Sequence, residues 1–429
     1  MLTNIYFEQF KSYEKGFLRL APLTLMIGAN ASGKSNALEG FRFLSWLSEG
    51  QKLSVLRHRV DDSDKVLRGN INDLPYLNWG SFTLGCDLDE SPWNRFRVTV
   101  DVRKVDLHIS QESISGSDMD APLYSIVHPS KDEDSDITVV YDDGDSNGEK
   151  AQITCTDQIA VMCQLESPAI YNGKRDQVTI PETVKRFQQA LTQTLFLDPV
   201  PSRMREASSP EKTLRSDCAN LSGVLKTLCD DGDYYQKIIH FIRSLPEQDV
   251  RSIKFFEYGR GRISFDLVES FGGVDRNCPM ELLSDGTLRV LAIAVALFSA
   301  PVGSTVVIEE VDNGIHPSRA KQLLGMMKEE AGRRNIRLLL TTHNPALMDA
   351  LPDESLADVV FCYRDPEKGD SRLIRLADLD DYPGLVVQGS LGGLVTNGVV
   401  DRFAKLPVDP ESKKQQAMDW ISRMQGEET

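Results

Sequence analysis

A glycine-rich loop between a strand and a helix is the sequence feature that most constrains this chain. The apolar run at residues 23–27 suits a buried strand, and residues 36–47 have a helical apolar pattern. Between them stands GANASGKS, residues 28–35, which fits the pattern G-x-x-x-x-G-K-S/T. Such a loop points backbone N–H groups at a phosphate chain, beside the positive end of the helix. The segment therefore predicts a phosphate-binding unit of strand, loop and helix.

Phosphoryl transfer needs more than this loop. We expect Lys34 to reach the terminal phosphates and the Ser35 hydroxyl to hold Mg²⁺. The chemistry also needs a second acid beside the metal and a group that positions water. A β-branched run, residues 305–308, predicts a buried parallel strand, and it ends in Glu309 and Glu310. One of these carboxylates can complete the metal shell while the other orients and deprotonates water.

Two further segments offer candidate site residues, one at a helix start and one at a strand end. The sequence LSDGT, residues 283–287, precedes an apolar helix at 288–298, and a serine and a glycine at a helix start favour anion binding. A second buried run, residues 338–342, ends in His343. A histidine at a strand end is more often a satisfied polar residue than a catalytic one. The order of all four motifs along the chain favours the functional interpretation.

In this order the motifs resemble ATPase heads of the ABC type, in the RecF/SMC-like branch. More narrowly, they resemble the predicted ATPases related to OLD (overcoming lysogenization defect) proteins of bacterial defence systems. Besides the phosphate loop, the resemblance rests on LSDGTLR at 283–289, IEEVDNGIHP at 308–317, TTHNP at 341–345, and the opening segment at 5–13. The sequence departs from the branch's usual I-E-E-P-E-N-G-L-H-P at Val311 and Asp312.

The resemblance implies both a fold and residue roles. It implies an α/β P-loop head with a mixed or parallel sheet, flanking helices and an antiparallel β-subdomain. The residue pattern of this sequence adds an inserted helical lid and, unlike SMC-like proteins, no long coiled coil. Glu309 corresponds to the magnesium-side acid, Glu310 to the carboxylate that activates water, and His343 to the switch histidine. The implied ATP-binding residues are Gly28, Asn30, Ser32, Gly33, Lys34, Ser35, Asn36, Ser284 and Gly286, with Ser35 and Glu309 on Mg²⁺ and with Lys34, Glu310 and His343 as catalytic residues.

The implied quaternary structure rests on Ser284 and Gly286. In this family the signature motif contacts the γ-phosphate that a second subunit binds, so the resemblance implies a homodimer with ATP between two heads. Residues 313–316 match the loop that crosses this interface. A higher oligomer built from such dimers stays open.

We expect four regions along the chain. Alternating apolar residues at 80–110 predict antiparallel strands, and a 3.6-residue apolar pattern predicts helices at 182–245. No apolar heptad is sustained between the phosphate loop and the signature. The expected regions are an N-terminal ATPase lobe with the phosphate loop and β-subdomain at 1–180, an inserted helical lid at 181–250, a C-terminal ATPase lobe at 251–375, and a tail at 376–429.

A nuclease centre is not expected in this chain. OLD-type relatives often add a metal-dependent nuclease domain with an Asp-x-Asp sequence. Residues 378–381 contain Asp-x-Asp, but no matching acidic strand precedes them. We interpret them as a helix start in preference to a metal site. The acid-rich segment at 129–149 is interpreted as a solvated hairpin, with a partner-binding loop as the alternative.

Charge and cysteine content limit the partners. The chain carries 48 Lys+Arg against 64 Asp+Glu, a formal charge of −16, which argues against general coating of nucleic acid. A local basic groove stays open, and residues 203–215 hold the candidate side chains Arg203, Arg205, Lys212 and Arg215. Seven cysteines without a Cys-x-x-Cys pair indicate reduced thiols, and no run of 18 apolar residues occurs. We expect a cytoplasmic protein that does not enter a membrane.

Two functions from different classes follow. In the first, the chain is an ATP-binding and ATP-hydrolysing switch that controls a separate effector, a nuclease or toxin, in bacterial defence against phage. In the second, it is a RecF-like DNA-maintenance ATPase that clamps duplex DNA when ATP closes the dimer. A nucleotide-binding scaffold with little turnover is a third interpretation, which Glu310 disfavours. The net acidic charge favours a protein partner.

Overall fold

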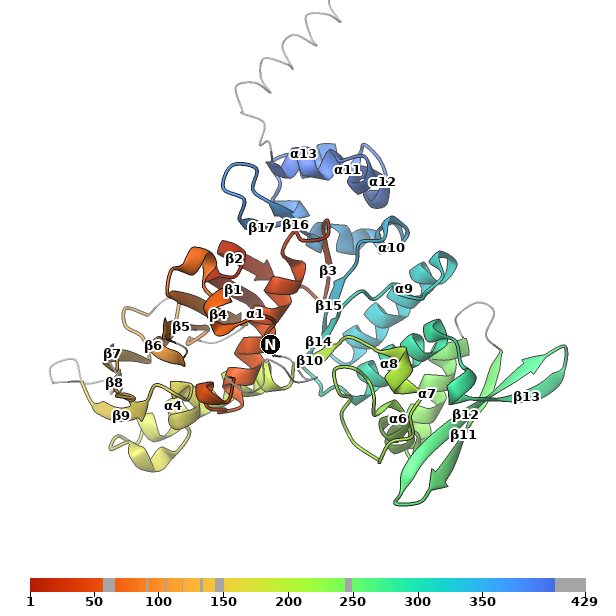
Figure 1. The fold of residues 1–429 in the computed structure, drawn as a ribbon, viewed down its shortest axis with the longest axis horizontal. Helices are drawn as coiled ribbons and strands as arrows, with labels where there is room; N and C mark the ends of the chain where they lie inside the picture. Colours follow the sequence, from red (N-terminus) through yellow and green to blue (C-terminus); the bar gives the residue numbers. More distant parts are fainter. Residues whose placement is uncertain are drawn as a thin grey trace, which may run out of the picture.

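In a computed structural model, three sheets and their helices form a mixed α/β protein, which confirms the expected fold class (Figure 1). The structure describes residues 1–56, 66–89, 92–104, 106–117, 119–131, 134–142, 150–243 and 249–405. Parts of the acidic segment at 129–149, and the end of the predicted tail beyond residue 405, lie outside these ranges.

The six-stranded sheet at the centre has the order β10-β14-β15-β3-β16-β17. Its first five strands are parallel, and β17 forms an antiparallel hairpin with β16. The strands are β10 (Leu195–Leu197), β14 (Thr305–Ile308), β15 (Arg337–Thr341), β3 (Leu23–Ile27), β16 (Val360–Arg364) and β17 (Ser371–Arg375). Every residue of β3 and β14 is buried, as expected for parallel strands that are covered on both faces.

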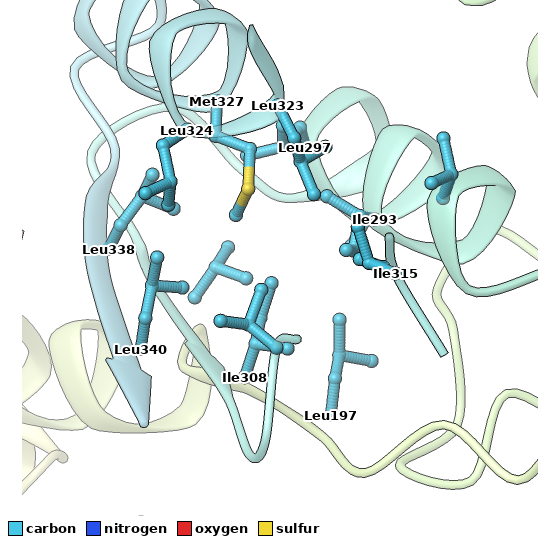
Figure 2. Packing of buried hydrophobic residues seen from close by; sticks show 14 of the residues in the cluster. Leu197, Ile293, Leu297, Ile308, Ile315, Leu323, Leu324, Met327, Leu338 and Leu340 are labelled. Atoms are coloured by element: carbon cyan, nitrogen blue, oxygen red, sulfur yellow. The ribbon is translucent and has the colours of Figure 1, made fainter. Parts of the chain in front are cut away.

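Helices cover both faces of this sheet. On one face, α8 (Asp285–Ser299) and α9 (Pro317–Arg333) pack their apolar side chains against β14 and β15, and Figure 2 shows Leu297 and Met327 in one cluster with Ile308 and Leu338. On the other face, α1 (Lys34–Ser48) shares a second cluster with Val307 and Leu339. Neighbouring strand residues point to opposite faces, so one short strand serves two cores.

An eight-stranded antiparallel sheet flanks α1, with the order β2-β1-β4-β5-β6-β7-β8-β9. Its strands are β1 (Leu2–Phe10), β2 (Tyr13–Arg19), β4 (Ser81–Leu88), β5 (Arg95–Arg103), β6 (Asp106–Ser115), β7 (Tyr124–His128), β8 (Asp136–Tyr141) and β9 (Gln152–Thr156). The antiparallel strands predicted at 80–110 are therefore confirmed. Two helices follow β9, namely α3 (Val161–Gln164) and α4 (Asp176–Thr192).

The segment predicted as a helical lid holds mainly helices. These are the larger part of α4, then α5 (Pro201–Met204), α6 (Leu221–Cys229) and α7 (Gly232–Arg243). Helices α6 and α7 lie beside a three-stranded sheet of β11 (Val250–Tyr258), β12 (Arg262–Phe271) and β13 (Val274–Pro279) (Figure 1). One part of the range 181–250 is not helical, because β10 is the edge strand of the central sheet. The four-region division itself stays a prediction.

Short helices close the described chain. They are α10 (Pro345–Asp349), α11 (Tyr382–Val386), α12 (Leu391–Thr396) and α13 (Val399–Lys405). The side chain of Asp381 caps α11, where its Oδ1 accepts the Gly384 N–H at 3.2 Å, so the predicted helix start is confirmed. Within the described ranges, no group of three or more His, Cys, Asp and Glu side chains could hold a metal ion. The described helices include none long and apolar enough to cross a bilayer.

Candidate functional site

The predicted site residues gather where the parallel strands end. The phosphate loop follows β3, Glu309 follows β14, and His343 lies two residues beyond β15. Carboxyl ends of parallel strands share one sheet edge, which is where such folds bind ligands. A cavity of about 330 Å³ opens there. Of the predicted residues, Asn30, Gly33, Lys34, Ser35, Asn36, Glu309, Glu310 and His343 line it.

Gly28 and Ser32 belong to the loop but are not among the residues that line the cavity. Gly28 has a φ of 146°, and a Cβ there would lie 2.2 Å from the Cys362 carbonyl oxygen, so only glycine fits. The Ser32 carbonyl accepts hydrogen bonds from Ser371 Oγ at 2.6 Å and from Cys362 Sγ at 3.3 Å. Strands β16 and β17 thus hold the loop from its rear.

A buried tyrosine supports the second half of the loop. Tyr13 OH donates to the Gly33 carbonyl at 3.1 Å, and burial raises the pKa of this phenol well above its ordinary value. Asn36 Nδ2 donates to Ser12 Oγ at 2.8 Å, which ties the start of α1 to the turn between β1 and β2. The loop conformation therefore depends on residues from strands that are distant in sequence.

Lys34 is held at the mouth of the loop. Its Nζ donates to the carbonyl oxygens of Gly28 at 2.6 Å and Ala29 at 3.0 Å. Burial lowers the pKa of Lys34, while the nearby Cys362 and Glu310 act in the opposite direction. The ammonium group is therefore held by the backbone of the loop that would surround a phosphate chain.

Glu309 and Ser35 present oxygen atoms to the same cavity. Arg42 Nη2 lies 3.2 Å from one Glu309 carboxylate oxygen, and Arg68 Nη2 lies 3.8 Å from the other. Burial raises the pKa of Glu309, with Arg42 lowering it in part. Oxygen ligands suit Mg²⁺, which takes one or two protein ligands and completes its shell with phosphates and water. The donor set therefore fits a nucleotide-bound Mg²⁺.

Glu310 is held in an unusual backbone conformation. Its φ is 46°, in the left-handed region that residues other than glycine seldom adopt. The Glu310 N–H donates to Thr341 Oγ1 at 2.9 Å, and Asn313 Nδ2 donates to a Glu310 carboxylate oxygen. Strained residues of this kind cluster at functional sites, where surrounding contacts maintain them. Neighbouring groups thus hold both the backbone and the carboxylate of Glu310, which lines the cavity.

The two departures from the usual sequence of the branch that the chain resembles have a structural explanation. The Val311 N–H donates to the Thr341 carbonyl at 3.1 Å, a bond that the usual proline cannot make. The buried Asp312 accepts a hydrogen bond from Thr342 Oγ1 at 2.6 Å. Together these contacts fix the segment after Glu310 to the end of β15.

The predicted signature residues are not in the cavity of their own chain. Neither Ser284 nor Gly286 is among the residues that line it. Ser284 is the exposed N-cap of α8, and its Oγ accepts the Thr287 N–H at 3.1 Å. A Cβ on Gly286 would lie 2.3 Å from the Gly314 carbonyl oxygen, so this glycine packs directly on the 313–316 loop.

Sequence reasoning missed several residues of the site. Thr341, Thr342 and Arg364 line the cavity, but they carry no role in the motifs from which the site was predicted. A signal for the threonines was their position at the end of a buried strand, next to His343. For Arg364 the sequence signal was its position at the end of another apolar run.

The basic side chains at 203–215 do not form a free basic strip. Arg203 pairs with Asp217 at 2.7 Å, and Arg215 pairs with Glu211 at 2.7 Å. Arg205 Nη2 lies 2.6 Å from a carboxylate oxygen of Asp285, beside the start of α8. The charges of these three arginines are therefore already balanced within this chain, whereas Lys212 forms no ion pair among the described residues.

A protein-family model matches part of the chain. The family is described as an AAA domain, putative AbiEii toxin of a type IV toxin–antitoxin system, and the match covers residues 210–349. That range contains the signature, the acidic pair and His343, but not the phosphate loop. Combined with the cavity geometry, it supports an ATPase of the P-loop class. No curated protein sequence matches the chain.

Solved structures with similarity to the chain include SMC heads. One is an Smc head bound to the C-winged helix domain of ScpA, with 14% identity, a TM-score of 0.46, and coverage of 87% of this chain and 96% of that chain. The SMC head domain from Thermotoga maritima has 14% identity and a TM-score of 0.40, over 87% and 98%. The Smc head with an extended coiled coil from Pyrococcus furiosus, bound to the C-terminal domain of ScpA, has 12% identity and a TM-score of 0.41, over 87% and 95%.

Proposed function

We propose that this chain binds ATP with Mg²⁺ and hydrolyses it, and that it works as a switch. One observation carries the proposal. Lys34, Ser35, the acidic pair Glu309 and Glu310, and His343 line one cavity at the carboxyl edge of a parallel sheet. These are the groups that phosphoryl transfer to water requires, namely a phosphate cradle, a metal-side acid and a group that positions water.

The reaction follows from where these side chains lie. Loop N–H groups and Lys34 bind the phosphate chain, and Ser35 and Glu309 would hold Mg²⁺. When bound between these two side chains, the ion would supply charge neutralisation and orientation to the phosphates. The Glu310 carboxylate accepts a hydrogen bond from a water molecule and takes its proton as the oxygen attacks the γ-phosphorus. The bond from that phosphorus to the bridging oxygen breaks, leaving ADP and phosphate.

The contacts around Glu310 explain how one carboxylate can act as the base. Asn313 holds one of its oxygens, and Thr341 fixes its backbone N–H. A preorganised base loses less entropy when the water arrives. His343 is exposed at the edge of the cavity, where its ring can donate to the γ-phosphate.

The switch requires a second copy of the chain. Ser284 and Gly286 form a helix N-terminus suited to an anion, yet they do not line the cavity of their own chain. We therefore propose that each signature completes the nucleotide site of a partner copy. Loss of the γ-phosphate removes the negative charge that bridges the two heads, so hydrolysis opens the dimer.

We further propose that the dimer controls a separate nuclease or toxin effector in bacterial defence, as the OLD-like motifs imply. Support comes from the matched family, whose description refers to a toxin system, and from the net charge of −16. The RecF-like alternative predicts duplex DNA binding that requires ATP and weakens with salt. Purification with the product of the neighbouring gene, followed by mass measurement of the complex, separates the two functions.

The ATPase proposal is tested with a lysine pair. Lys34→Ala should lose ATP binding and phosphate release, because it removes the charge within the loop. Lys368→Ala removes the same charge from an exposed surface pair with Glu14, outside the cavity, and should behave like the parent protein. Equal ATP binding and hydrolysis by the parent and Lys34→Ala would overturn the proposal.

A further inference from the structure

Arg364 is a cation in the cavity that the ATPase motifs do not include. It is the last residue of β16, and it lines the same cavity as Lys34 and Glu310. Its side chain is held by two backbone carbonyls. The Nε donates to Ala31 at 3.0 Å, and Nη1 donates to Gly369 at 2.9 Å. The guanidinium is thus fixed against the phosphate loop.

The charge of Arg364 has no carboxylate partner among the described residues. Its neighbour Arg372 differs, because its nitrogens lie 3.6 Å from Glu14 and 2.9 Å from Asp370. Both arginines belong to one hairpin of β16 and β17. Of the two, Arg364 lines the cavity and lacks an ion pair within the described chain. Two neutral carbonyl acceptors leave the positive charge of Arg364 to attract an anion.

The contact with Ala31 adds a second role. Ala31 has a φ of 62°, in the left-handed region, and it stands at the turn of the phosphate loop. Its carbonyl is the acceptor of the Arg364 Nε hydrogen bond. The arginine therefore holds a strained part of the loop while its remaining N–H groups stay available at the cavity.

We propose that Arg364 binds the terminal phosphate of the nucleotide within its own chain. This inference rests on the proposed function, since it assumes that the cavity holds a nucleoside triphosphate. A guanidinium in this cavity neutralises negative charge on the γ-phosphate together with Lys34, and it stabilises the charge that spreads over the γ-oxygens during transfer. Arg364 thus makes the site discriminate ATP from ADP.

The test compares two ligands in the full-length protein with Mg²⁺. Calorimetry measures binding of the ATP analogue with an imido β–γ bridge, which is not hydrolysed, and binding of ADP. Arg364→Ala should weaken the ATP analogue by about ten-fold to a hundred-fold and ADP by less than about three-fold. Arg364→Lys should recover part of the loss because its charge remains. Lys368→Ala is the control in the same hairpin and should bind both ligands like the parent.

Two results would overturn the inference. Arg364→Ala could bind both ligands like the parent protein, or it could lose the same factor for both, which is what a purely loop-shaping role predicts. A thermal unfolding midpoint close to that of the parent shows that the variant is folded. Failure of the proposed function would look different, because Lys34→Ala would then bind both ligands as well as the parent does.

Discussion

The two halves of the proposed nucleotide site are built in different ways. The phosphate-loop half is supported from behind by Tyr13, Cys362 and Ser371, which come from three different strands. The signature half is the exposed N-terminus of α8, whose capping serine bonds within its own first turn. One half lines the cavity of its own chain, and the signature residues of the other half do not.

This difference indicates that the phosphate-loop half is the more rigid of the two. Buried hydrogen bonds each contribute about 1 kcal/mol, and several of them converge on the loop that must hold its shape before a nucleotide arrives. The start of α8 is held by its cap, the Arg205–Asp285 pair and the contact of Gly286 with Gly314. An exposed helix N-terminus that is capped within its own chain is stable without a partner. It can therefore bind a second molecule reversibly.

The largest effect is expected from the base in the phosphate-loop half. Glu310→Gln removes the proton acceptor but keeps the shape, so the hydrolysis rate should fall by about 10²- to 10⁴-fold. Binding of ATP should remain close to that of the parent, and dimers should accumulate with ATP. Single-turnover phosphate release and light scattering measure the two quantities. A variant that hydrolyses ATP at the parental rate would remove Glu310 from the mechanism.

The next effect tests the signature half. Ser284→Asp keeps an oxygen that caps α8 but places a negative charge where the partner's triphosphate is proposed to bind. Hydrolysis should fall by about a hundred-fold, because like charges at an interface cost several kcal/mol. Binding of ATP to the monomer should not change. Ser284→Asn keeps the cap without the charge and serves as the control; equal rates for Asp and Asn would contradict the dimer proposal.

A smaller effect is expected from the residue that fixes Glu310. Thr341→Val removes the Oγ1 that accepts the Glu310 N–H, while the side chain keeps nearly the same shape. The rate should fall by about ten-fold, with little change in ATP affinity. The value of kcat is normalised to the amount of folded protein, because a loss of folding would also lower the apparent kcat and leave KM unchanged. A parental kcat would show that the strained backbone needs no such support.

The smallest effect concerns pH and Mg²⁺. Burial raises the pKa of Glu309, and only its ionised form binds the ion, so Glu309 loses this capacity at a higher pH than an exposed glutamate does. The Mg²⁺ concentration for half-maximal hydrolysis should rise a few-fold as the pH falls from about 7.5 to 5.5. Glu309→Gln is the reference for Mg²⁺-dependent nucleotide binding, because its remaining pH dependence comes from other groups. Identical pH profiles would contradict the metal-side role.

Much of the phosphate-loop half could be predicted from the sequence, because its residues are contiguous. Strand, loop and helix stand within 23–48, and the acidic pair follows directly after a buried strand. The pattern of strands at 80–110 was equally local. Edge strand β10 was missed because its three residues lie between helices, and only pairing with β14 makes them a strand.

The supporting contacts could not be predicted in the same way. Tyr13, Cys362 and Ser371 meet the loop only after the chain has folded, and no spacing in the sequence links them to it. Arg364 belongs to the same class, since its place at the cavity depends on the pairing of β16 with β3. Local motifs therefore reveal the groups that do chemistry, while tertiary contacts decide which groups assist them.

The most direct test of the two-chain site mixes two inactive variants. Lys34→Ala lacks a working loop but has an intact signature, and Ser284→Asp has the reverse. A mixed dimer contains one complete site, formed by the loop of one chain and the signature of the other. Random exchange in equal amounts should restore about a quarter of the parental ATPase rate, since half of the dimers are mixed and each has one active site of two. A mixture that stays as inactive as the separate variants would contradict a site shared between two chains.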